Sequence, residues 1–395
     1  MAKRYDFDEQ INRRGSASIK WDGADRIFGG KDLLPMWVAD MDFRVPDEVT
    51  SALKSRVEHG LYGYTERTDS YLESVREWMK GRHEWQIEKR WICHSPGVVT
   101  ALNLIVDGFT KPGDKILVQP PVYPPFIKAA INQGRGLIEN PLVCERGRYH
   151  MNFTDLERKM SDPSVRLMLL CSPHNPVGRV WSRDELLRVA ELAAASHVLV
   201  VSDEIHSDLI FKGFHHIPFA SLSEEAQQHA IICTAPSKTF NLASLQVSNI
   251  IIPNDQLRKK YMNQIRRFNL SEPNTAGMIA AEAAYRSGSS WLDQCLDYIK
   301  RNADYVSTFF RDHLPMLSMS PLEGTYLGWI DCHRLRLGKR ELQNFMVQKA
   351  GLALNPGYTF GEEGAGFVRI NLACPHAYVE KAMKQLKRAV DTLKR

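Results

Sequence analysis

Short apolar runs alternate with amphipathic stretches through the middle of the chain, from about residue 95 to residue 260. Runs of this length that are rich in Val, Ile and Leu are typical of strands buried on both faces of a sheet. They lie at 115–119, 165–170, 198–201, 230–233 and 247–252. Between two of them, residues 183–193 have helical spacing and Ser182 as an N-cap. The alternation predicts an α/β fold, with a mostly parallel central sheet and helices on both faces.

The pattern changes after about residue 286. A long stretch of helical spacing runs through Trp291 to Phe310, and a second helix is predicted from about Ala377 to Lys394. We find no internal repeat and no low-complexity linker between the two regions.

Composition places the chain among ordinary globular proteins. Its 395 residues suffice for a large core, and 44% hydrophobic and 25% charged residues are usual values. The net charge of +5 is small and the basic residues are scattered, which argues against a nucleic-acid surface. There is no secretory signal and no apolar run of the roughly 20 residues that a membrane span needs. Seven cysteines without CxxC pairs favour the reducing cytoplasm.

Three successive predicted strands are each followed by a polar residue: Asn175, Asp203 and Lys238. Chemistry in α/β proteins gathers at such strand ends. Burial lowers the pKa of an amine there, and a neutral amine attacks an aldehyde. A carboxylate keeps a pyridine nitrogen protonated, and an amide donates to a phenolic oxygen. These three groups, in this order, are what a pyridoxal 5′-phosphate (PLP) enzyme requires.

The ordered motifs resemble the fold-type I PLP enzymes, the aspartate aminotransferase superfamily, and within it the MalY/PatB group of cystathionine β-lyase-like carbon–sulfur lyases. The resemblance covers nearly the whole chain and implies a large PLP-binding domain over 45–285, with a smaller α+β domain from 1–44 and 286–395. Its motifs are MWVADMDF at 36–43, PVYPPF at 121–126, CSPHNPVG at 171–178, SDEIH at 202–206, APSKTFNLA at 235–243 and VRINL at 368–372.

The same resemblance implies a cofactor site. Lys238 would bind PLP and act with Asp203 and Tyr123 in catalysis. Residues 95–100 precede a helical run, and a helix N-terminus of this kind suits a phosphate. The implied cofactor-binding residues are Lys238, Asp203, Asn175, His206, Tyr123, Gly97, Val98, Ser237 and Tyr64.

On the substrate side, the resemblance implies that Arg369 binds the α-carboxylate, with Asn175, Trp37 and Asp40 beside it. A guanidinium can hold a carboxylate in bidentate fashion, which a lysine cannot. A tyrosine at Tyr64 or at nearby Tyr62 would cross to the partner's phosphate, so we expect a homodimer with a shared active site.

Two positions depart from the aminotransferase pattern. His206 stands where those enzymes usually carry tyrosine, and a histidine can also donate to the ring oxygen. Gln246, eight residues after Lys238, stands where aminotransferases carry an arginine, so one positive charge that would bind the phosphate is missing.

Other motifs have weaker interpretations. The Asp203–His206 string matches a helicase motif, but no phosphate-binding GxxxxGK[ST] loop precedes it. Asp203, His206 and Asp208, or His215 with His216, do not converge by spacing alone, so we predict no metal. The glycine-rich stretch 361–366 lacks the strand-then-helix context of a dinucleotide site and is interpreted as a flexible loop.

The resemblance predicts β-elimination from cystathionine or other S-substituted L-cysteines, giving a thiol, pyruvate and ammonia. The first alternative is a class I/II aminotransferase, which would share Lys238, Asp203 and Arg369. A PLP-binding regulatory protein is a remote alternative, and no appended helix-turn-helix supports it. The substrate is expected to be a small amino-acid thioether, with no nucleic acid or membrane partner.

Overall fold

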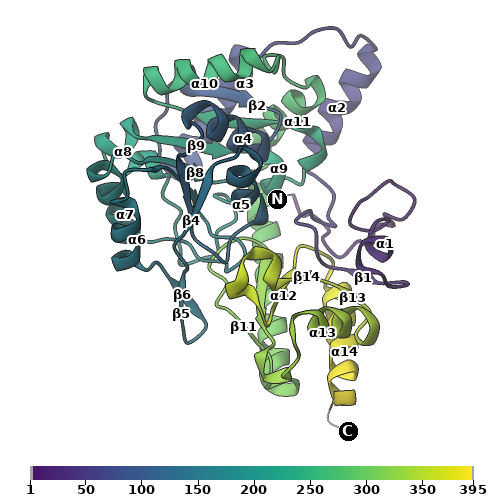
Figure 1. The fold of residues 1–395 in the computed structure, drawn as a ribbon. Coiled ribbons are helices and arrows are strands. Elements are labelled where there is room, and N and C mark those ends of the chain that lie inside the picture. Colours follow the sequence, from purple (N-terminus) through teal and green to yellow (C-terminus); the bar gives the residue numbers. More distant parts are fainter. Residues whose placement is uncertain (1–2, 394–395) are drawn as a thin grey trace.

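The computed structural model describes residues 3–393. Its main element is a seven-stranded sheet in the order β2-β10-β9-β8-β7-β3-β4 (Figure 1). Strands β9, β8, β7, β3 and β4 are parallel neighbours, whereas β10 runs antiparallel to both β2 and β9. The predicted α/β fold with a mostly parallel sheet is therefore confirmed. The strands are β2 (Ile92–Ser95), β3 (Lys115–Val118), β4 (Gly136–Glu139), β7 (Val165–Cys171), β8 (Leu199–Asp203), β9 (Ala230–Thr234) and β10 (Ser248–Ile251).

Strand residues alternate between two hydrophobic cores, which explains the continuous apolar runs. In β7, Leu167 and Leu169 pack on one side while Met168 and Leu170 pack on the other. Helices α4 (Val98–Phe109), α5 (Pro124–Asn132) and α10 (Asp255–Arg267) contribute to the first core. The second core receives α3 (Asp69–His83), α6 (Phe153–Met160), α7 (Arg183–Ala195) and α11 (Thr275–Ser287). Helices thus cover both faces, and the predicted Ser182 cap forms a capping box with Glu185.

The C-terminal elements form a second sheet, drawn in green to yellow in Figure 1. Its antiparallel order is β11-β12-β15-β14, and both helices predicted for this region are present as α12 and α14. The predicted helix end at Lys394 lies outside the described residues. The elements are α12 (Ser289–His313), β11 (Ser318–Met319), β12 (Leu327–Asp331), α13 (Lys339–Asn344), β13 (Leu352–Ala353), β14 (Asn355–Pro356), β15 (Phe367–Asn371) and α14 (His376–Leu393).

The N-terminal segment joins this second region. After α1 (Ala24–Phe28), strand β1 (Leu34–Pro35) pairs in parallel with β13. The pairing supports the proposed small domain made from both chain ends, whose boundaries stay a prediction. The remaining elements are α2 (Asp47–His59), the hairpin β5 (Val143–Glu145) and β6 (Arg148–His150), α8 (Glu224–Gln228) and α9 (Pro236–Thr239). The predicted loop 361–366 includes one short 3₁₀ turn, Glu362–Gly364.

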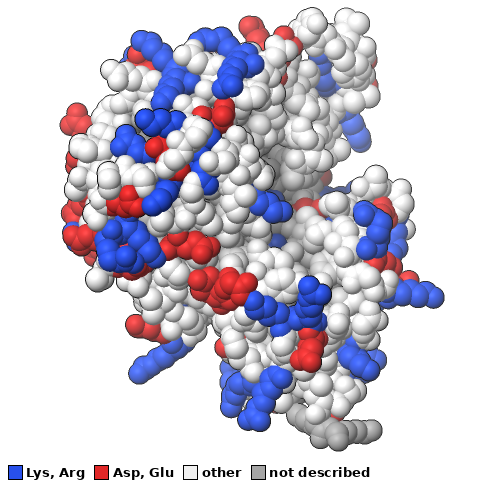
Figure 2. All heavy atoms as spheres, in the orientation of Figure 1, with Lys and Arg blue, Asp and Glu red and all other residues white. Residues whose placement is uncertain are grey.

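Several properties bear on the function classes considered above. Basic and acidic side chains are interspersed over the face shown in Figure 2. In the part of the chain that the structure describes, no helix is both long and apolar enough to cross a membrane. Within residues 3–393, no three His, Cys, Asp or Glu side chains are grouped to hold a metal ion. All seven cysteines are free thiols, and only Cys144 is exposed.

Candidate active site

The carboxyl ends of β7, β8 and β9 lie side by side, and a cavity of about 300 Å³ opens there. Because these strands are parallel neighbours, the polar residues at or just beyond their ends reach the same place. Asn175, Asp203 and Lys238 all line the cavity, as the sequence predicts. The other predicted residues that line it are Gly97, Val98, Tyr123, His206 and Ser237.

Lys238 lies on α9, the short helix that follows β9. Its Nζ donates a hydrogen bond to the main-chain oxygen of Ala39 at 2.7 Å. Burial and the positive charge of Arg369 lower the pKa of Lys238 to about 8. The amine therefore loses its proton far more readily than a surface lysine, which prepares it for attack and for proton transfer.

Asp203 is the last residue of β8 and is buried. Its Oδ1 accepts a hydrogen bond from the Ile205 N–H at 3.1 Å. Burial raises the pKa of this carboxyl group to about 7, because one N–H and the charge of Lys238 only partly offset its desolvation. A cationic ring nitrogen placed against Asp203 would supply the missing counter-charge.

Arg369 lies in the middle of β15 and is buried. One terminal nitrogen donates to Asn175 Oδ1 at 2.8 Å. The other donates to Asn355 Oδ1 at 2.7 Å and to the Trp37 carbonyl at 3.1 Å, while Nε has no hydrogen-bond partner. Burial lowers the pKa of Arg369 to about 10. All its partners are neutral oxygens, so its charge remains available to an anionic ligand.

His206 and Tyr123 are two further titratable side chains that line the cavity wall. His206 Nδ1 is buried without a hydrogen-bond partner, and burial lowers the pKa of the ring far below its ordinary value. The neutral ring packs edge-on against Tyr326, with centroids 5.9 Å apart. Tyr123 precedes α5, and burial raises its pKa. Both residues remain neutral near pH 7 and can contact an aromatic ring.

The part of the cavity wall formed by the start of α4 can receive an anion. Gly97 is the N-cap of the twelve-residue helix α4, and no side chain caps this helix. Free N–H groups and the positive end of the helix dipole therefore face the cavity. Ser237 adds a hydroxyl, and Gln246 also lines the cavity at the position where aminotransferases carry arginine.

Arg369 does not line the cavity itself but contacts Asn175, which does, and the remaining predicted residues lie elsewhere. Tyr64 is 94% exposed, and Tyr62 is exposed as well, so neither contributes to the cavity of its own chain. The Trp37 indole donates to the Lys20 carbonyl at 3.1 Å. The Asp40 carboxylate is bound by two cations of the N-terminal segment. Their roles as partner and substrate contacts stay predictions.

The cavity residues suit PLP. The Asp203 carboxylate can pair with a protonated pyridine nitrogen, and the Lys238 amine can react with an aldehyde. The start of α4 and the Ser237 hydroxyl can bind a phosphate. The unpartnered buried nitrogens of His206 and Arg369 are further evidence that polar ligand atoms belong here.

Sequence reasoning did not identify four groups of the site. The Ala39 carbonyl accepts from Lys238, and the Tyr326 hydroxyl donates to the same oxygen at 2.9 Å. Asn355 binds Arg369, and the Phe360 ring lies 4.8 Å from the guanidinium carbon. Ala39 falls within a motif that was recognised, but its backbone oxygen carries no sequence signal. The other three lie on segments that tertiary packing alone brings together.

Comparisons with known proteins agree with this geometry. The profile of the aminotransferase class I and II family matches residues 31–386. Cystathionine beta-lyase PatB of Bacillus subtilis (strain 168) is 45% identical over 98% of this chain and 100% of its own length. Protein MalY of Escherichia coli (strain K12) is 32% identical over 99% of this chain and 100% of its own.

A solved structure gives the same result. Cystalysin from Treponema denticola, which contains a pyridoxal 5′-phosphate cofactor, has a TM-score of 0.96 and 40% identity. The match covers 99% of this chain and 100% of cystalysin. The resemblance predicted from the motifs is confirmed, and the chain belongs to the aminotransferase class I and II family.

Proposed function

We propose that the protein is a PLP-dependent carbon–sulfur β-lyase. It cleaves cystathionine or other S-substituted L-cysteines to a thiol, pyruvate and ammonia. The observation that carries the proposal is a set of three uncompensated buried groups: Lys238 and Asp203, which line the cavity, and Arg369, which contacts the cavity residue Asn175. The full-length similarity to a cystathionine β-lyase favours the lyase over an aminotransferase.

The cavity residues would hold the cofactor from all sides. Lys238 would bind it through Nζ, Asp203 would accept from the pyridine nitrogen, and Tyr123 would contact the ring. Asn175 and His206 would donate to the phenolic oxygen. The Gly97 and Val98 N–H groups and the Ser237 hydroxyl would hold the phosphate, with less positive charge than in aminotransferases because of Gln246.

Bound PLP supplies an electron sink for the bonds at the substrate Cα. Arg369 binds the α-carboxylate with Asn175 beside it, which orients the Cα–H bond. Lys238, released from the cofactor when the substrate amine replaces it, would then take the Cα proton as general base, which its pKa of about 8 permits near neutral pH. The β-sulfur leaves with its bonding electrons. Because a thiol pKa is about 8.5, this leaving group is far better than an alkoxide.

A homodimer completes the proposed site. Tyr64 is almost fully exposed, and Leu61 and Tyr62 beside it are also exposed apolar side chains. A second copy covering this segment would bury them and bring Tyr64 to the partner's phosphate.

The six buried free thiols and the exposed Cys144 support a cytoplasmic location.

The test uses purified protein, PLP and L-cystathionine, with pyruvate, ammonia and free thiol measured with and without 2-oxoglutarate. We expect thiol and pyruvate without any keto acid. Glutamate formation that requires 2-oxoglutarate, with no thiol released, would instead identify an aminotransferase.

A further inference from the structure

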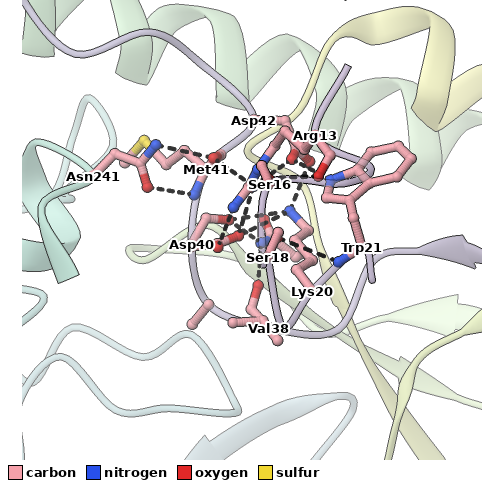
Figure 3. A network of polar contacts seen from close by, with 12 residues as sticks. Arg13, Ser16, Ser18, Lys20, Trp21, Val38, Asp40, Met41, Asp42 and Asn241 are labelled. Carbon is pink, nitrogen blue, oxygen red and sulfur yellow. Dashed lines mark hydrogen bonds and ion pairs between the residues drawn. The ribbon is translucent and has the colours of Figure 1, made fainter. Parts of the chain in front are cut away.

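Four charged side chains form a compact group beside the active site, which we call the N-terminal charge cluster (Figure 3). Arg13 and Lys20 come from the N-terminal segment, and Asp40 and Asp42 come from the motif at 36–43. Arg13 contacts Asp40 at 2.7 Å and Asp42 at 2.6 Å. Lys20 Nζ lies 2.7 Å from Asp42 and 3.4 Å from Asp40. Each cation therefore bridges both carboxylates.

The centre of the cluster is removed from water. Lys20 is 1% exposed and Asp42 is 3% exposed. Burial alone would neutralise them, but Asp42 and Asp40 raise the pKa of Lys20 above its ordinary value. Lys20, with hydrogen bonds from Trp21 and Arg13, likewise holds the pKa of Asp42 below its usual range. Lys20 and Asp42 thus remain ionised as a buried pair, with Arg13 in contact with Asp42 and Asp40 in contact with Lys20.

The cluster also binds the backbone of the 37–43 segment. Lys20 Nζ donates to the Asp40 carbonyl at 3.2 Å, and Arg13 donates to the Met41 carbonyl at 3.1 Å. From the opposite side, Asn371 donates to the carbonyls of Val38 and Asp40, each at 2.6 Å. The segment is therefore held between the N-terminal residues and β15.

Two carbonyls of this segment are left to contact the active site. The Ala39 oxygen accepts from Lys238, and the Trp37 oxygen accepts from Arg369. Neither Arg13 nor Lys20 lines the cavity, and the Trp37 indole is itself bonded to the Lys20 carbonyl. The cluster therefore reaches both reactive side chains through one backbone segment.

We propose that the N-terminal charge cluster positions the Ala39 and Trp37 carbonyls against Lys238 and Arg369, so that Arg13 and Lys20 act as positioning residues for the reaction. This inference rests on the proposed function. A carbonyl acceptor at 2.7 Å stabilises the ammonium form of Lys238. If the 37–43 segment loosens, the ammonium form of Lys238 loses the Ala39 carbonyl as its acceptor, so the pKa of Lys238 falls further. Arg369 then also loses the Trp37 carbonyl, one of the contacts that orient it.

Lys238 titrates among several other groups that the test must hold constant. Arg369 opposes its charge, whereas Asp40 and Asp203 favour it, and neutral His206 lies nearby. The variants leave all four of these residues unchanged, but each Met substitution also removes a cation paired with Asp40. That loss of charge alone would raise the pKa of Lys238, so a fall in the pH midpoint reports the lost carbonyl contact.

The experiment compares Lys20→Met and Arg13→Met with their conservative forms, Lys20→Arg and Arg13→Lys. The full-length chain freed of PLP is mixed with PLP, and the rate of uptake is followed by absorbance as a function of pH. We expect the pH midpoint to move down by about half a unit or more in the Met variants, with recovery in the conservative forms. In the PLP-loaded enzyme, we expect KM for the amino acid to rise about threefold to tenfold.

Arg135→Met is the matched control. Its side chain is 8% exposed, and its partners are confined to residues 107–133, away from the 37–43 segment. We expect this variant to lower Tm without moving either the pH midpoint or KM.

If the cluster variants lower Tm but behave like Arg135→Met in uptake and KM, the cluster only stabilises the fold and the proposal is wrong. Arg13 is 22% exposed, so Arg13→Met decides the question if Lys20→Met does not fold. The uptake profile needs no turnover, and therefore tests the cluster even if the lyase assay fails.

Discussion

Asp203 and Asp42 are almost equally buried, 5% and 3% exposed, but they lie in regions with opposite electrostatics. At the cavity, burial raises the pKa of Asp203 to about 7, with one N–H as hydrogen-bond donor. In the N-terminal charge cluster, Lys20, Trp21 and Arg13 hold the pKa of Asp42 below its usual range. The lysines show the same contrast, since the pKa of Lys238 is lowered and that of Lys20 is raised.

The titratable side chains are buried in both regions, so their charged and hydrogen-bonding partners determine the direction in which each pKa shifts. Charges that are paired within the chain hold a segment in place. Charges that are left unpaired cost stability, and that cost is recovered when a ligand of complementary charge binds. The comparison therefore separates residues that position the site from residues that bind the cofactor and substrate.

The largest expected effect comes from Lys238→Ala. Loss of the general base should lower kcat about 1,000-fold or more. The cofactor-free variant should be no less stable than wild type, because a buried amine with little compensation is removed. Steady-state kinetics and thermal unfolding test both parts, and retained turnover would contradict the assignment of Lys238.

The two aspartates provide a matched pair of substitutions with opposite expected signs. Asp42→Asn leaves buried Lys20 with only the more distant Asp40 carboxylate, at 3.4 Å, and should destabilise the protein by about 3 kcal/mol at pH 7. Asp203→Asn mimics a protonated carboxyl group and should stabilise the cofactor-free protein by about 2 kcal/mol or more at pH 8. Urea unfolding measures both differences.

The pH dependence of these differences follows from the pKa directions. The folded-state pKa of Asp42 is lowered, so its stabilising contribution is present above about pH 4 and is lost as pH falls further. The folded-state pKa of Asp203 is raised, so its contribution is full below about pH 4 and is lost as pH rises through about 7. If both variants shifted stability in the same direction at pH 8, the contrast between the regions would be wrong.

Arg369→Met tests whether the unpaired guanidinium serves the substrate. Loss of a charge-assisted hydrogen-bond pair costs roughly 2–3 kcal/mol, so kcat/KM should fall about 100-fold. Arg179→Met is an informative contrast, because that buried arginine is already paired with Glu323 and Glu185 and its loss should act mainly on stability. An unchanged kcat/KM in Arg369→Met would assign Arg369 a structural role.

The smallest expected effect concerns the partner subunit. Tyr64→Phe should weaken PLP retention about tenfold, whereas Tyr62→Phe should leave it unchanged. Dialysis followed by absorbance measures the bound fraction, with sedimentation as a check that both variants stay dimeric. If only Tyr62→Phe weakened PLP retention, Tyr62 would be the residue that reaches the partner's phosphate. If neither variant weakened it, the prediction of a shared active site would be wrong.

The sheet and its carboxyl-end residues were predictable because their signals are local. Strands β7, β8 and β9 are mostly apolar runs, and a polar motif begins at or within a few residues of the end of each. Parallel neighbours then bring Asn175, Asp203 and Lys238 together without further information. The antiparallel direction of β10 was not predictable, since an apolar run does not encode the direction of a strand.

The N-terminal charge cluster could not be found in this way. Arg13 and Lys20 lie in a polar segment that suggests a solvated surface, and lysine is among the residue types least often buried. Lys20 is buried only because this segment packs across Asp40 and Asp42. The carbonyls of Trp37 and Ala39 act through their backbone position, which side-chain patterns do not show.

The most direct test of the account is reduction of the PLP-loaded protein with borohydride, followed by peptide mapping. Reduction fixes the cofactor to whichever amine it is linked to. We predict that the pyridoxyl group is found on Lys238 alone. A label on Lys20 or on any surface lysine, with Lys238 unmodified, would contradict the claim that the unpaired charges at the sheet's carboxyl end form the cofactor site.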